Sequence, residues 1–87
     1  MTIDEKRDEI MQLDRILVDY FQKRMSAIKD LAVLKKKANA GLADADFENK
    51  KMKELLSDVD GEYKEVTLKY IMNLLKLSRE FQSEMIS

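Results

Sequence analysis

The stretch from Ile3 to Ala38, IDEKRDEIMQLDRILVDYFQKRMSAIKDLAVLKKKA, contains neither Pro nor Gly and is rich in strong helix formers. It predicts one continuous helix. About 36 residues at roughly 1.5 Å each give a length on the order of 50 Å, whereas a compact domain of this size has a radius of gyration of only about 12 Å. The helix must therefore extend beyond its own domain. We expect its apolar side to be covered by a second copy, in an intertwined homodimer.

The rest of the chain is also helical in composition, with no Pro and only 2 Gly among its 87 residues. The strong breaks are Ala38-Asn-Ala-Gly41 and Ser57-Asp-Val-Asp-Gly61. We predict an all-α fold of a single domain, residues 1–87, with helices over residues 3–38, 44–57 and 61–86.

Composition excludes several function classes. The chain has no Cys and no His, which rules out disulfides, thiolate chemistry, Cys- or His-ligated metal and a His general base. A net charge of −1 argues against nucleic-acid binding through a broad basic surface. The N-terminus is too charged for a signal peptide, and no apolar run reaches transmembrane length, so we expect a cytoplasmic protein without a membrane partner.

Two cations interrupt the apolar stripe of the first helix. The stripe runs through Ile10, Leu13, Leu17, Tyr20, Ile28 and Leu31. Arg24 and Lys35 fall near its centre and point the same way, since about three turns separate them. The simpler explanation is that both side chains extend from the edge of the core and keep their charges in water. This suits Lys35, which is near a helix end, better than Arg24, which is in the middle of the helix. Cations that face a core require anionic partners.

The other two helices place polar residues beside their apolar stripes. Ser78 and Gln82 form an i, i+4 pair in the third helix, where hydrogen bonds between helices are the simpler interpretation. Asp44 and Glu48 form another such pair at the start of the second helix. Asp44 alone is explained by the helix dipole, and Glu48 is able to pair with Lys35 or Arg24.

Arg7 lies about 25 Å from Arg24 along the helix axis. It cannot share a pocket with Arg24 of its own chain, but in an antiparallel dimer it approaches Arg24 and Lys35 of the other chain. Together these side chains predict a pocket for a small dianion that carries a hydroxyl group.

The ordered set of motifs resembles the all-helical type of chorismate mutase. It comprises RDEIMQLD (residues 7–14), RM from Arg24, KKK from Lys35, D-x-x-x-E from Asp44 to Glu48, and SREFQ from Ser78 to Gln82. The resemblance implies an intertwined three-helix homodimer that rearranges chorismate to prephenate without a cofactor. A pericyclic step of this kind needs no nucleophile and no proton shuttle.

The resemblance also implies a role for each residue. Arg7 from the partner chain and Arg24 would bind the two carboxylates, with help from Ser78. Lys35 and Gln82 would donate to the ether oxygen, and Asp44 and Glu48 would hold the ring hydroxyl.

Two positions depart from the family pattern. Phe47 stands where the family usually has an arginine, and Arg79 stands where the family tends to be apolar. Our hypothesis is that Arg79 partly replaces the missing cation, against the simpler interpretation of a solvated arginine near a helix C-terminus.

Two other functions compete with this one. An isochorismate-pyruvate lyase on the same scaffold would bind a closely related dianion, and having both Asp44 and Glu48 favours the mutase. A non-catalytic helical dimer would use the Met residues and Phe47 for regulation or docking. Members of the family are often docked to neighbouring shikimate-pathway enzymes, so such a partner is a further expectation.

Overall fold

The computed structural model describes residues 1–41 and 45–86, leaving aside the side chain of Ile86. Over these residues it contains α1 (Ile3–Lys37), α2 (Ala45–Ser57), a 3₁₀ turn η1 (Gly61–Tyr63) and α3 (Lys64–Ile86), without a strand. The predicted all-α fold of three helices is therefore confirmed. The first helix ends at Lys37, one residue earlier than predicted, and the third helix is preceded by the 3₁₀ turn over the first residues of its predicted range. Asp44, the predicted start of the second helix, lies outside the described residues.

Both ends of α1 are capped: the first by the side chain of Thr2, and the last by a backbone turn at Asn39. At the start, the hydroxyl of Thr2 accepts a hydrogen bond of 3.1 Å from the backbone N–H of Glu5. At the end, Asn39 takes a left-handed conformation with φ of 53°. The N–H groups of Asn39 and Ala40 then reach back to the carbonyls of Lys36 and Lys35, at 3.2 and 2.8 Å. This is a Schellman motif with Asn in the place that Gly most often takes.

We expect Asn39→Ala to lower the free energy of unfolding by about 0.5–1 kcal/mol, because only Gly and, less readily, Asn adopt this conformation at little cost. Denaturant unfolding at one fixed protein concentration measures the change. Asn39→Gly is the control and should be at least as stable as the wild type. Equal stability of the Ala and Gly variants would contradict this account of the turn.

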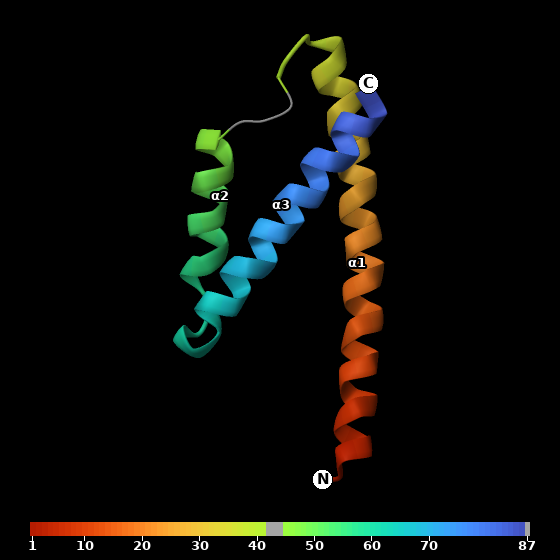
Figure 1. The fold of residues 1–87 in the computed structure, drawn as a ribbon, viewed down its shortest axis with the longest axis vertical. Coiled ribbons are helices and arrows are strands. Elements are labelled where there is room, and N and C mark those ends of the chain that lie inside the picture. Colours follow the sequence, from red (N-terminus) through yellow and green to blue (C-terminus); the bar gives the residue numbers. More distant parts are fainter. Residues whose placement is uncertain (42–44, 87) are drawn as a thin grey trace.

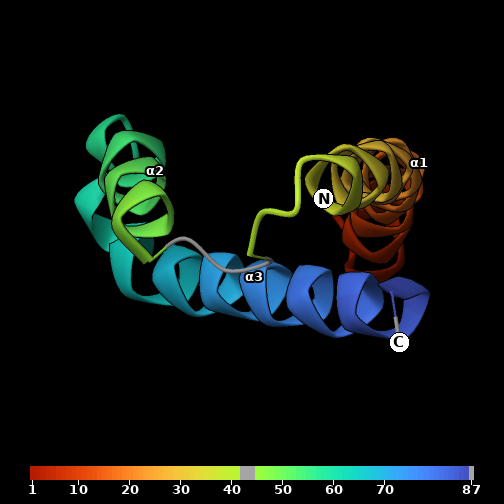
Figure 2. The same ribbon diagram turned by 90° about the horizontal axis from the view of Figure 1, so that it is seen from above.

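The three helices form an open arrangement rather than a closed bundle. The molecule measures 54 × 25 × 16 Å and has a Cα radius of gyration of 16.1 Å, well above the approximately 12 Å of a compact domain of this length. Figures 1 and 2 show α1 and α2 on the same side of α3, near its opposite ends. In the described parts of the chain, α1 and α2 each pack against α3, while their backbones do not approach one another closely.

The core of a single chain is small. Among the described residues, the buried apolar side chains are Ala32, Ile71 and Leu75, while every residue from 1 to 20 is exposed. The N-terminal half of the predicted α1 stripe is therefore poorly covered within the chain, and Figure 1 shows this half of α1 running well past the other helices. None of the described helices is both long enough and apolar enough to cross a bilayer.

Candidate active site

All three helices contribute to one small cavity of about 70 Å³. It is lined by Arg24, Ile28, Leu31, Lys35, Phe47, Glu48, Lys51, Leu75, Ser78 and Gln82. Five of the seven predicted site residues are in this set, brought together from the C-terminal halves of α1 and α3 and the first turns of α2. The helical stripes therefore selected side chains that do converge in space.

Arg24 and Ser78 link α1 to α3 at the floor of the cavity. A guanidinium nitrogen of Arg24 donates to the Ser78 hydroxyl at 2.6 Å, and that hydroxyl donates to the carbonyl of Leu74 at 2.7 Å. Burial lowers the pKa of Arg24 from its usual value, and the charge of Tyr70 acts in the opposite direction. An arginine nevertheless stays protonated in a protein, so the cavity contains a half-buried cation whose orientation Ser78 fixes.

Gln82 is as deeply buried as Ser78, each being 4% exposed. Its Nε2 donates to the backbone carbonyl of Ser78 at 3.2 Å. Its Oε1 is buried without a hydrogen-bond partner among the described residues, which is uncommon because buried polar atoms are nearly always paired. The end of this amide is therefore available to a group that enters the cavity.

Glu48 has a partner that helical spacing did not suggest. Its carboxylate lies 3.1 Å from the guanidinium of Arg79, in an ion pair between α2 and α3. The pairing with Lys35 or Arg24 considered from the sequence is thus replaced by one with Arg79. Arg79 is half-exposed at 48% and is not among the side chains that line the cavity.

One predicted site residue, Arg7, is not at this cavity. Arg7 lies on the exposed half of α1, where its side chain is 76% exposed and 3.7 Å from Asp4. Asp44 lies outside the described residues. That Arg7 reaches a site in a partner chain stays a prediction.

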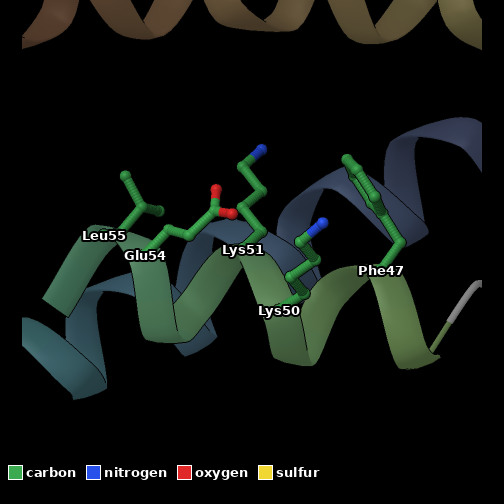
Figure 3. A pocket seen from close by; sticks show the side chains of 5 residues that line it. All are labelled: Phe47, Lys50, Lys51, Glu54 and Leu55. Atoms are coloured by element: carbon green, nitrogen blue, oxygen red, sulfur yellow. The ribbon is translucent and has the colours of Figure 1, made fainter. Parts of the chain in front are cut away.

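Lys51 lines the cavity although it was not among the predicted residues. It follows Glu48 by one helical turn, and this spacing was the signal in the sequence that should have placed it on the same face of α2. Phe47, 61% exposed, borders both this cavity and a larger hollow of about 450 Å³ along α2. Figure 3 shows both side chains extending from α2 toward α1, together with Lys50, Glu54 and Leu55.

The arrangement suits the binding of a small anion. The cavity has three cations, Arg24, Lys35 and Lys51, and one carboxylate, which Arg79 already pairs. Buried hydroxyl and amide groups lie beside them. In the part of the chain that the structure describes, no group of three acidic side chains is placed to hold a metal ion.

Comparison with known families agrees with this geometry. The sequence model of the chorismate mutase type II family matches residues 6–83, nearly the whole chain and all of the cavity residues. Comparisons with curated proteins and with solved structures give no significant match. The chain belongs to the chorismate mutase type II family.

Proposed function

We propose that this protein is a chorismate mutase, which rearranges chorismate to prephenate for the synthesis of Phe and Tyr in the cytoplasm. The observation that carries the proposal is the convergence of Arg24, Lys35, Glu48, Ser78 and Gln82 on one cavity in a chain of this family. These are a cation-rich set with a hydroxyl, an amide and a single acid, as a hydroxylated dicarboxylate requires.

The first part of the mechanism is conformational. Chorismate reacts only when its enolpyruvyl side chain folds over the ring, and fixing that conformer supplies a large part of the rate enhancement. Arg24, oriented by its 2.6 Å bond to Ser78, would hold one carboxylate. The carboxylate of Glu48, oriented by Arg79, would accept a hydrogen bond from the ring hydroxyl.

The second part is electrostatic. Negative charge develops on the ether oxygen as its bond to the ring breaks, and donors aimed at that position stabilise the transition state. Lys35 and Gln82 would supply these donors. For Gln82 this requires a rotation of its terminal amide, which brings Nε2 to the place where Oε1 now lies without a partner.

The site would be completed by a partner chain. A cavity of about 70 Å³ is smaller than the approximately 300–1,000 Å³ that is usual for ligand sites, so one chain encloses too little space for the substrate. The exposed apolar residues of the first half of α1 would pack on a second copy, and the same helix would deliver Arg7. The homodimer and its shared sites are thus parts of one proposal.

We expect the purified protein to convert chorismate to prephenate without added cofactor and to bind a bicyclic dicarboxylate mimic of the transition state more tightly than chorismate. Loss of chorismate absorbance measures turnover, and calorimetry measures binding. In parallel, isochorismate is supplied and salicylate fluorescence is recorded. If salicylate forms and prephenate does not, the protein is an isochorismate-pyruvate lyase rather than a mutase. If there is no turnover and no saturable binding, the result supports a non-catalytic dimer.

A further inference from the structure

We infer that Lys51 is a substrate-binding residue of this cavity, where its ammonium contacts a carboxylate of the dianion, and that Arg79 is a positioning residue that keeps Glu48 away from Lys51. The inference rests on the proposed function. It adds a further cation to the substrate-binding residues, and it gives the Arg79–Glu48 ion pair a role in positioning Glu48.

The position of Lys51 supports a contact with ligand. Lys51 is half-buried, whereas its neighbour Lys50 is exposed. Its side chain lines the same cavity as Arg24 and Lys35. In Figure 3 its Nζ points away from the backbone of α2 into the space before α1, on the side of Phe47. Lys51 lines the cavity together with the apolar side chains of Ile28, Leu31 and Leu75, and a cation at such a wall attracts an anion that enters the cavity.

The described acidic side chains near Lys51 do not pair with it, so a bound ligand would provide the anion. Glu48, three residues earlier on the same helix, is the natural ion-pair partner of Lys51. Its carboxylate is instead held by Arg79 at 3.1 Å. Among the described residues, no acidic oxygen lies within the 4.0 Å of an ion pair to Lys51, including that of Glu54 one turn later.

The Arg79–Glu48 pair therefore has two effects. It orients a carboxylate at the edge of the cavity, and it leaves Lys51 without an acidic partner among the residues that the structure describes. The simpler alternative is that Lys51 covers apolar surface with its methylene groups and keeps its charge in water. In that case neutralising Lys51 would not change the preference of the site for a dianion.

The test compares Lys51→Met with Lys50→Met, which places the same change at the adjacent residue, one that borders the larger hollow along α2 but not the cavity. We expect Lys51→Met to raise the Kd for the bicyclic dicarboxylate about tenfold, as for a lost charge-assisted hydrogen bond, and Lys50→Met to change it less than about twofold. The matching monocarboxylate, which lacks the carboxylate that Lys51 contacts, should bind Lys51→Met and wild type alike. Circular dichroism checks folding, and Lys51→Gln serves as the second neutral variant if the Met variant does not fold.

The role of Arg79 is tested by coupling. Arg79→Ala frees Glu48 to pair with Lys51, so we expect several-fold weaker dicarboxylate binding in the wild-type background and a smaller effect in Lys51→Met. If the two substitutions are simply additive, the positioning role is overturned.

Failure of the inference and failure of the proposed function give different results. A wild type that binds and turns over substrate, with Lys51→Met and Lys50→Met equal in Kd, overturns the role of Lys51 alone. A wild type that neither turns over chorismate nor binds the dicarboxylate overturns the proposed function, and this inference with it.

Discussion

Arg24→Ala lowers kcat/KM for chorismate by about 10²–10³-fold, the range typical for removing one donor from a preorganised charged site. The structure fixes the orientation of Arg24 through its 2.6 Å hydrogen bond to Ser78. Removal of Arg24 takes away the hydrogen bond that joins α1 to α3 and, in the proposed site, the contact to one substrate carboxylate. Steady-state kinetics gives the change in kcat/KM, and denaturant unfolding separates a loss of function from a loss of fold.

The matched control is Arg15→Ala, an exposed residue on the side of the same helix opposite its apolar stripe. It should keep kcat/KM within about twofold of wild type, since exposed charges contribute little. A wild-type kcat/KM for folded Arg24→Ala would contradict the assignment of Arg24 to the carboxylate.

Mixing two inactive variants restores activity if each site takes Arg7 from one chain and Lys35 from the other. We expect Arg7→Ala and Lys35→Ala each to lose about 10²-fold in kcat/KM. Random exchange of equal amounts makes half of the dimers mixed, and one of the two sites in each mixed dimer has both residues, so activity recovers to about a quarter of wild type. Subunits are exchanged through mild denaturant before the assay.

The control for this experiment mixes Arg24→Ala with Lys35→Ala. These two residues line the same cavity within one chain, so every site in a mixed dimer lacks one of them and activity stays low. Equal recovery in the two mixtures, or none in either, would contradict a site that is shared between chains.

Much of the fold and part of the site follow from helical periodicity. The breaks at residues 38–41 and 57–61 place the helices because an uninterrupted run of helix formers leaves few other places for a turn. The central positions of Arg24, Ser78 and Gln82 in their stripes predict that they face inward, and all three do. Periodicity assigns a residue to a face of its own helix, and this was enough for these three.

The remainder depended on how the helices are placed relative to each other. The Glu48–Arg79 pair joins residues 31 positions apart, so no spacing within a helix reveals it. Lys51 lies beside the α2 stripe of Met52, Leu55 and Leu56, and whether such a lysine meets solvent or a cavity depends on how α2 is turned toward α1. The sequence carries this information only through tertiary packing.

The exposed first half of α1 has a consequence for control of the activity. Most of the stability of a helix in a protein comes from the tertiary packing of its apolar face, and residues 3–16 of α1 are exposed in a single chain. In the proposed dimer, ordering this segment, pairing two chains and delivering Arg7 are a single thermodynamic event. The fraction of chains that form complete sites then rises with the protein concentration in the cell. In the proposed dimer, the catalytic activity per chain therefore depends on the expression level, without an effector.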